Sequence, residues 1–193
     1  LEDWWVEETG RNLLDLPSYH LQAAQDGIKL DLSLDDQKGP ILQGDQGFSR
    51  KGPEAGQASA YYSLTRLNSE GMLSIGEELF AVRGASWMDH EYSTSVLTAE
   101  QVGWDWFSFQ FDDNSELMVF QIRKADGSVD PFSSGAWISP QGAVTPLTQQ
   151  NFNITVTKTW QSPHSKAVYP AEWEINIPTL DFQLKFEPYI ADQ

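Results

Sequence analysis

Residues Gly27–Leu34 read GIKLDLSL, and their spacing decides the fold class. Every second residue from Ile28 to Leu34 is aliphatic, and each residue between them is charged or polar. Successive side chains of a β-strand point to opposite faces of its sheet. The alternation therefore predicts a strand with one buried face and one solvated face.

The same alternation returns along the rest of the chain, in the runs 152–158, 173–177 and 180–186. Helical periodicity is weak throughout. The one candidate helix, within residues 13–25, is interrupted by Pro17, which cannot donate a backbone hydrogen bond. The sequence therefore predicts an all-β protein with antiparallel strands.

Residues 35–59 form a stretch rich in glycine, proline and polar residues between strand-like segments. A loop of this length is usually a linker or a functional segment, so we place a domain boundary in it, between residues 1–57 and 58–193. After the boundary we expect about ten short strands separated by turn-like sequences such as DDNSE and ADGS. This pattern suits a closed antiparallel barrel or a sandwich, and we favour the barrel because several strands have two usable faces.

Composition limits the classes of partner. The 193-residue chain has 28 acidic and 12 basic residues and a formal net charge of -16, which repels phosphate backbones and argues against nucleic acid. It has no cysteine, so thiol catalysis and disulfides are excluded. No apolar run approaches the length of a membrane helix, so we do not expect an integral membrane protein. Eight tryptophans, ten phenylalanines and six tyrosines suggest aromatic-lined cavities.

Two strand-like segments have two distinct faces. In GWDWFSFQF, residues 103–111, Trp104 and Trp106 share one face with polar residues, whereas Asp105 shares the other with three phenylalanines. In ELMVFQIR, residues 116–123, one side carries Met118, Phe120 and Ile122, and the other carries Leu117, Val119, Gln121 and Arg123. Such strands fit the wall of a small barrel, with one face packed and the other lining a cavity or an inter-domain cleft.

The segment ASWMDHEY, residues 85–92, places three ionisable residues together. Alternation puts Trp87, Asp89 and Glu91 on one face and His90 on the other, which argues against a local metal site. The two carboxylates would lie roughly 6.5–7 Å apart along the strand. Repulsion between like charges in a partly dry site favours keeping one protonated, which makes a neutral, proton-donating Asp89 reasonable.

An ordinary salt bridge is the alternative for this acid. Its partner would be Arg66, Arg83 or Arg123, and the residues alone favour neither explanation over the other.

Several catalytic motifs are missing. No G-x-S-x-G nucleophile elbow and no H-E-x-x-H zinc motif occurs, and His20, His90 and His164 are widely spaced. The stretch GDQGFSRKG lacks the spacing of a phosphate-binding loop. We therefore predict no metal site and no cofactor.

Short clusters in a fixed order then point to a family. They are LEDWW (1–5), LQG (42–44), GFSRKG (47–52), YYS (61–63), WMDHE (87–91), GWDWF (103–107), QIR (121–123), WQSP (160–163) and YP (169–170) ahead of Trp173. On these clusters the whole chain resembles the AttH-like proteins, relatives of the carotenoid 1,2-hydratases that are often labelled secreted hydrolases.

The resemblance implies two lipocalin-like β-barrels packed side by side with a cleft between them. Family members are longer at the front, so residues 1–57 would hold the end of the first barrel and the linker, and residues 58–193 the whole second barrel. The resemblance also implies a periplasmic or cell-envelope location and an association with an ABC-transport system. The chain begins without methionine in a strand-like pattern, so we expect residues before Leu1.

The hydratases of this family carry an essential aspartate in a motif similar to Tyr-x-Asp-x-Asn. This aspartate falls on Asp89, with Trp87 at the tyrosine position and Glu91 at the asparagine position. The chain thus departs from the hydratase pattern at two of three positions but retains the acid.

Two main hypotheses follow for function. The first is a lipocalin-like protein that binds a lipophilic small molecule, an isoprenoid or a lipid, in a barrel or an inter-domain cleft. The second is a hydratase in which Asp89 protonates an alkene, indole faces stabilise the carbocation, and Glu91 or Gln121 positions water. The candidate ligand-binding residues are Tyr61, Trp87, Trp104, Trp106, Gln121 and Arg123. A purely structural partner of a membrane complex would need no pocket.

Overall fold

The computed structural model describes residues 4–54, 56–93 and 97–192, so residues 1–3 of the first sequence cluster lie outside it. In this part of the chain every long element is a β-strand, and the only helical element is the short 3-10 turn η1 (Pro178–Leu180). All strand pairs are antiparallel. The predicted all-β, antiparallel fold class is confirmed.

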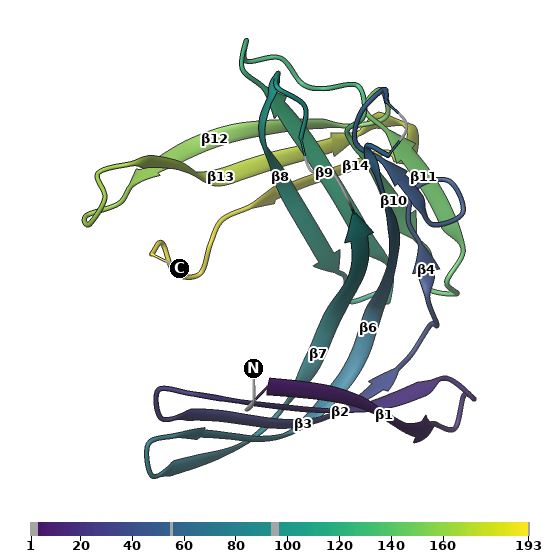
Figure 1. Cartoon of the computed structure of the whole chain (residues 1–193), viewed down its shortest axis with the longest axis vertical. Helices are drawn as coiled ribbons and strands as arrows, with labels where there is room; N and C mark the ends of the chain where they lie inside the picture. Colours follow the sequence, from purple (N-terminus) through teal and green to yellow (C-terminus); the bar gives the residue numbers. More distant parts are fainter. Residues whose placement is uncertain (1–3, 55, 94–96, 193) are drawn as a thin grey trace.

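The strands form three sheets arranged along an open curve (Figure 1). The first sheet contains β1 (Trp4–Arg11), β2 (Pro17–Gln25), β3 (Ile28–Asp36), β4 (Ile41–Leu42), β5 (Phe48–Arg50), β6 (Ala58–Ile75) and β7 (Glu78–Ser93). The second contains β8 (Gln101–Gln110), β9 (Glu116–Lys124), β10 (Ser134–Ile138) and β11 (Val144–Thr148). The third contains β12 (Asn153–Gln161), β13 (Val168–Ile177) and β14 (Phe182–Phe186).

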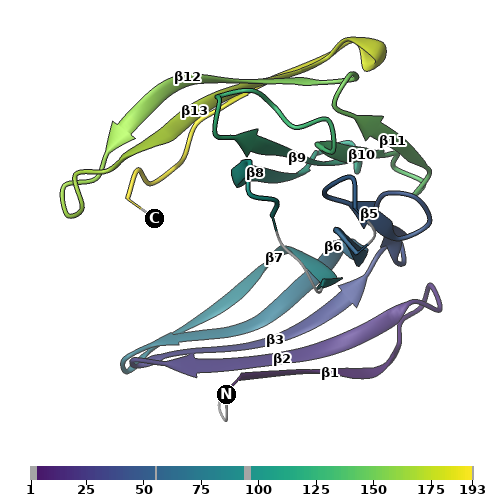
Figure 2. The same ribbon diagram turned by 45° about the horizontal axis from the view of Figure 1, so that its top comes forward.

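The long hairpin of β6 and β7 connects the two ends of the molecule, as Figure 2 shows from a second side. The second half of β6 pairs with β3, whereas its first half pairs with the short strands β4 and β5. A register shift between Leu64 and Leu67 separates the two halves. Such a bulge bends a strand, so one hairpin can serve two layers. The boundary predicted after residue 57 falls just before β6, and the two-domain division stays a prediction.

Strand β9 is the most buried strand, because both of its faces are covered. Leu117 and Val119 pack with residues of β11, β12 and β13 in the largest apolar cluster, together with the phenylalanines of β8. Met118, Phe120 and Ile122 pack in a second cluster on the other side, with Tyr61 of β6. The grouping of side chains predicted from alternation agrees with these clusters, but the face of β9 that packs in the largest cluster is the mixed one.

The candidate helix within residues 13–25 does not form. Residues 17–25 are instead strand β2, which lies between β1 and β3 and pairs with both along its length. Pairing with two neighbours satisfies its backbone groups, and tertiary context of this kind outweighs weak local propensity. No helix of the described residues is long and apolar enough to span a membrane.

A buried charge cluster joins the first and second sheets. Glu116 at the start of β9 is fully buried, and its carboxylate lies 2.5 Å from the Lys38 amine and 2.5 Å from Nε of Arg66. Lys38 follows β3, and Arg66 lies in the bulge of β6.

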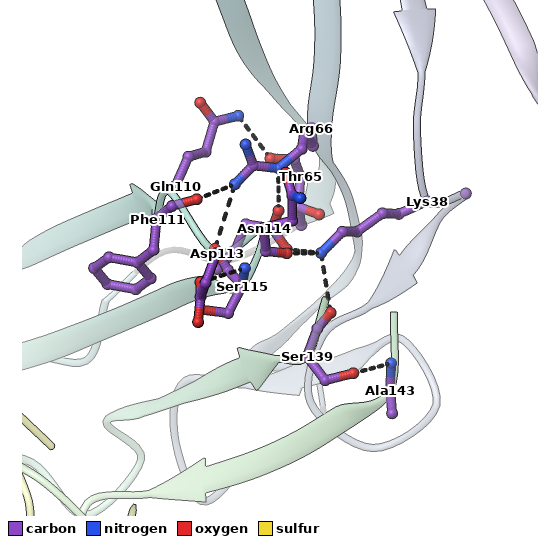
Figure 3. A network of polar contacts seen from close by, with 12 residues as sticks. Lys38, Thr65, Arg66, Gln110, Phe111, Asp113, Asn114, Ser115, Ser139 and Ala143 are labelled. Carbon is purple, nitrogen blue, oxygen red and sulfur yellow. Dashed lines mark hydrogen bonds and ion pairs between the residues drawn. The ribbon is translucent and has the colours of Figure 1, made fainter. Parts of the chain in front are cut away.

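The same two cations also hold the loops around Glu116, as Figure 3 shows. Lys38 donates to the carbonyls of Asn114 and Ser139, the latter at 3.0 Å. Arg66 donates to the carbonyls of Phe111 (3.0 Å) and Ser115 (3.3 Å). The cluster therefore fixes the β8–β9 turn against β6 and the end of β3.

Substituting Glu116→Gln should destabilise the fold strongly, because it leaves two buried cations without a counter-charge. We expect a loss of about 3–5 kcal/mol in the free energy of unfolding, measured by urea denaturation. The exposed pair of Glu8 and Arg11 supplies the matched control, since Glu8→Gln should change the free energy very little. Equal effects of the two substitutions would contradict this role for the cluster.

Candidate functional site

A cavity of about 330 Å³ lies between the β6–β7 hairpin and the β8–β9 hairpin. Its walls combine aromatic and aliphatic side chains with two charged residues, and they consist of Lys51, Ser59, Tyr61, Glu91, Ser93, Leu97, Trp104, Trp106, Phe120 and Ile122. The cavity uses the second face of β8 and β9, the face that does not pack on the third sheet.

Strand register explains why the acids of β7 face β6 side chains. Asp89 is paired with Ser63 and Glu91 with Tyr61, and paired residues of an antiparallel ladder project from the same face. The prediction that Trp87, Asp89 and Glu91 share a face agrees with this register. His90 points to the opposite face, where one ring nitrogen lies 2.7 Å from the hydroxyl of Tyr62.

The carboxylate of Asp89 accepts hydrogen bonds from three side chains. Tyr61 donates to one oxygen at 2.9 Å, and Ser63 (2.6 Å) and the indole of Trp87 (2.8 Å) donate to the other. The amide of Gln43 donates in turn to the hydroxyl of Ser63 at 3.1 Å. A carboxylate that receives three donors has its acceptor role fixed, so its oxygens are held in one orientation.

Two of the three arginines expected as partners of Asp89 pair with other acids. Arg66 pairs with Glu116, and Arg123 pairs with Asp105 at 3.4 Å, so neither supplies the expected salt bridge. Asp89 is held by neutral donors instead.

Tyr61 separates Asp89 from the cavity. Its side chain is buried and lines the cavity, whereas Asp89 is not among the lining residues. The hydroxyl of Tyr61 donates to Asp89 and accepts from the indole of Trp106 at 3.3 Å. Burial, followed by the negative charge of Asp89, holds the pKa of Tyr61 well above its usual value.

Glu91 forms the polar end of the cavity together with Lys51. The Lys51 amine lies 3.3 Å from a Glu91 carboxylate oxygen, and the hydroxyl of Ser59 donates to the same oxygen. The amine also donates to Ser49 at 2.8 Å and lies 3.9 Å above the ring of Phe120. Burial lowers the pKa of Lys51, and the nearby charge of Glu91 partly offsets this.

The indoles of β8 provide the apolar wall. Trp104 is paired with Ile122 and Trp106 with Phe120, so all four side chains lie on one face of the hairpin. The rings of Trp87 and Trp106 meet edge to face with centroids 6.5 Å apart. Six of the eight predicted residues lie in the walls or directly behind them: Tyr61, Trp87, Asp89, Glu91, Trp104 and Trp106. Glu91 lies at the polar end.

Gln121 and Arg123 do not join this site. Gln121 is paired with Asp105, and Arg123 forms an ion pair with the same aspartate. They share the face of β9 that carries Leu117 and Val119, whereas the cavity uses the face of Phe120 and Ile122. The odd and even positions of one strand cannot line the same cavity.

Sequence reasoning missed Lys51 as a site residue. This lysine stands in a glycine-rich loop, where the usual expectation is a solvated side chain. Its backbone is held by hydrogen bonds to Gln57 and Gln101, and its side chain lines the cavity. The only available signal was its place in the cluster GFSRKG, one of those on which the family resemblance rests. Within the described residues, no three His, Cys, Asp or Glu side chains are placed to bind a metal ion.

Comparison with known proteins agrees with this architecture. A family model described as AttH-like matches residues 1–193. A crystal structure assigned to AttH from Nitrosomonas europaea superposes with a TM-score of 0.86 at 32% identity, covering 99% of this chain and 57% of that one. The crystal structure of kievitone hydratase from Nectria haematococca superposes with a TM-score of 0.75 at 16% identity, covering 100% and 58%.

The second likeness shows the fold alone, because the sequence identity is low. The chain spans less than two thirds of the length of both proteins. None of the curated proteins matches the chain.

Tyr61 should remain protonated at pH values where an unperturbed tyrosine, with a pKa of about 10, ionises. Its pKa is higher in the folded than in the unfolded chain, so this group stabilises the fold below about pH 10 and the contribution is lost as the pH rises further. The free energy of unfolding, measured with urea, should therefore fall more steeply above about pH 10 in the wild type than in Tyr61→Phe. Phenolate absorbance gives an independent check, because the wild type and Tyr61→Phe should show the same increase near pH 10. An increase that is smaller by one tyrosine in the variant would contradict the expectation.

Proposed function

Because this chain belongs to the AttH-like family, we propose that it is a lipocalin-like protein that binds a lipophilic small molecule, an isoprenoid or a lipid, in the cavity between the β6–β7 and β8–β9 hairpins. One observation carries the proposal. The cavity is lined by aromatic and aliphatic side chains on one side and by a single charged pair, Lys51 and Glu91, on the other. Ligand sites in proteins usually combine an apolar lining with a few placed polar groups.

The geometry indicates how such a ligand would lie. Its apolar body would contact Trp104, Trp106 and Ile122, where ring faces and a methyl-rich side chain replace water. Its polar end would face Lys51 and Glu91, which together offer hydrogen-bond donors and acceptors. The volume of about 330 Å³ is near the lower limit for such sites and suits a slender chain or a small ring system.

Family membership also supports proposals about location and partners. We propose a periplasmic or cell-envelope location and a partnership with an ABC-transport system, to which the protein would deliver or from which it would receive its ligand. The net charge of -16 disfavours nucleic acid as the partner. Fractionation of the cells, followed by cross-linking of the tagged full-length protein, tests both proposals.

A hydratase is the second candidate, because Asp89 is linked to the cavity through the hydroxyl of Tyr61. Under this hypothesis the carboxyl of Asp89 is protonated and donates to Tyr61, reversing the hydrogen bond described above, and Tyr61 passes its own proton to an alkene. The faces of Trp104 and Trp106 would stabilise the carbocation, and Glu91 would position the water that adds to it and accept the proton that this water loses. The fold shared with a protein named kievitone hydratase is compatible with this chemistry.

Substituting Trp104→Ala should weaken ligand binding by about tenfold, because it removes one indole wall of the cavity. Trp4→Ala is the matched control, since Trp4 is equally half-exposed but lies on the first sheet. The measurement is quenching of tryptophan fluorescence by a lipophilic alcohol such as farnesol, in the full-length protein. An equal loss in both variants, or none in either, would place the ligand elsewhere.

The hydratase reading makes a separate prediction about Asp89. Asp89→Asn should lower hydration of a prenylated or isoprenoid alkene by about a hundredfold or more while ligand affinity changes little. Incorporation of labelled oxygen from water into the product measures turnover. Asp105→Asn, on the opposite face beside Arg123, serves as the control. Full turnover in Asp89→Asn would remove the mechanism and leave the binding function.

A further inference from the structure

Lys51 is a largely buried lysine whose amine borders the ligand cavity as well as forming an ion pair. Only 18% of its side-chain surface is exposed. The other lysine that is buried in an ion pair, Lys38, is enclosed by one carboxylate and two carbonyl oxygens. Lys158, by contrast, is an exposed lysine paired with Glu172.

We propose that the Lys51 amine forms a reversible imine with the carbonyl carbon of a lipophilic aldehyde or ketone bound in the cavity. The inference rests on the proposed binding function, because the carbonyl compound would occupy the same space. It extends that function by naming the ligand class and adding a covalent step.

The position of the amine supports this chemistry. It lies 3.9 Å above the ring of Phe120, and the ring of Tyr61 lies 5.3 Å away, so aromatic surfaces replace much of its water. Desolvation favours the neutral amine, in agreement with the direction in which burial moves the pKa of Lys51, whereas the ring faces and the carboxylate of Glu91 favour the cation. A lysine in an apolar pocket is a recognised nucleophile toward carbonyl carbons.

Glu91 is placed to move the protons of the reaction. Its oxygen lies 3.3 Å from the amine and also accepts the hydroxyl of Ser59. As the nitrogen lone pair forms the C–N bond, the carbonyl π pair moves to oxygen, and Glu91 transfers the proton from nitrogen to that oxygen. Glu91 then takes the second proton from nitrogen and delivers it to this hydroxyl, which leaves as water while the nitrogen lone pair forms the C=N bond. Water reverses the sequence and releases the ligand.

The charges around the amine favour a neutral carbonyl compound over an anion. Glu91 lies beside Lys51, and Asp89 lies behind Tyr61, so a carboxylate headgroup would meet two negative charges and one positive charge. A carbonyl oxygen brings no net charge, and Trp104 and Trp106 would accept the attached apolar body.

The test uses the full-length protein, 2-naphthaldehyde and the matching alcohol 2-naphthalenemethanol. Cyanoborohydride reduces an imine to a stable amine, which intact-mass measurement and peptide mapping then locate. We expect one adduct per chain, formed on Lys51 about tenfold or more faster than on Lys158. Lys51→Arg, which keeps the positive charge, should lose this adduct, whereas Lys158→Arg should retain it, and the wild-type protein should bind the alcohol without forming an adduct.

The outcomes separate this inference from the binding function. Binding of the alcohol without preferential labelling of Lys51 would overturn the imine and leave the binding function intact. Failure of both compounds to quench tryptophan fluorescence would overturn the two together. If Lys51→Arg fails to fold, the labelled position in the wild type still decides, because an adduct spread evenly over the exposed lysines contradicts the inference.

Discussion

Glu116 is a carboxylate with no solvent contact, and its position between Lys38 and Arg66 constrains three parts of the chain at once. These three charged side chains hold the end of β3, the bulge of β6 and the β8–β9 turn together at one point. A buried charge of this kind is tolerated only with close partners in good geometry, so these segments have few alternative arrangements. The cavity lies along the same β6 and β9 strands.

The two covered faces of β9 connect the apolar core to the cavity. One face builds the apolar core with the third sheet, and the other supplies Phe120 and Ile122 to the cavity. The core therefore fixes the position of one wall to within the tolerance of close packing. The opposite wall, Tyr61, is fixed by hydrogen bonds to Asp89 and Trp106 rather than by packing alone.

Alternation along the chain was sufficient to predict the fold class and most of the faces. It placed Trp104 and Trp106 together, separated His90 from the acids, and assigned the phenylalanines of β8 to the core. Alternation could not show which face of β9 borders the cavity, because Gln121 and Arg123 alternate as regularly as Phe120 and Ile122. Lys51 was beyond its reach for another reason: the residue lies in a loop without periodicity, and hydrogen bonds to distant residues orient it. The candidate helix within residues 13–25, against which Pro17 argued, is strand β2 because strand pairing on both sides outweighs local preference.

The bulge between Leu64 and Leu67 has a consequence for cooperativity. It makes one continuous hairpin part of two apolar clusters, since Leu64 and Leu67 belong to the cluster of the first sheet and Tyr61 to the cluster around β9. Loss of packing in either cluster therefore disturbs β6, and the strand pairing around the other cluster depends on β6 as well. The two layers are expected to unfold as a single unit. The backbone amides at both ends of β6 should therefore be protected from hydrogen exchange to a similar degree.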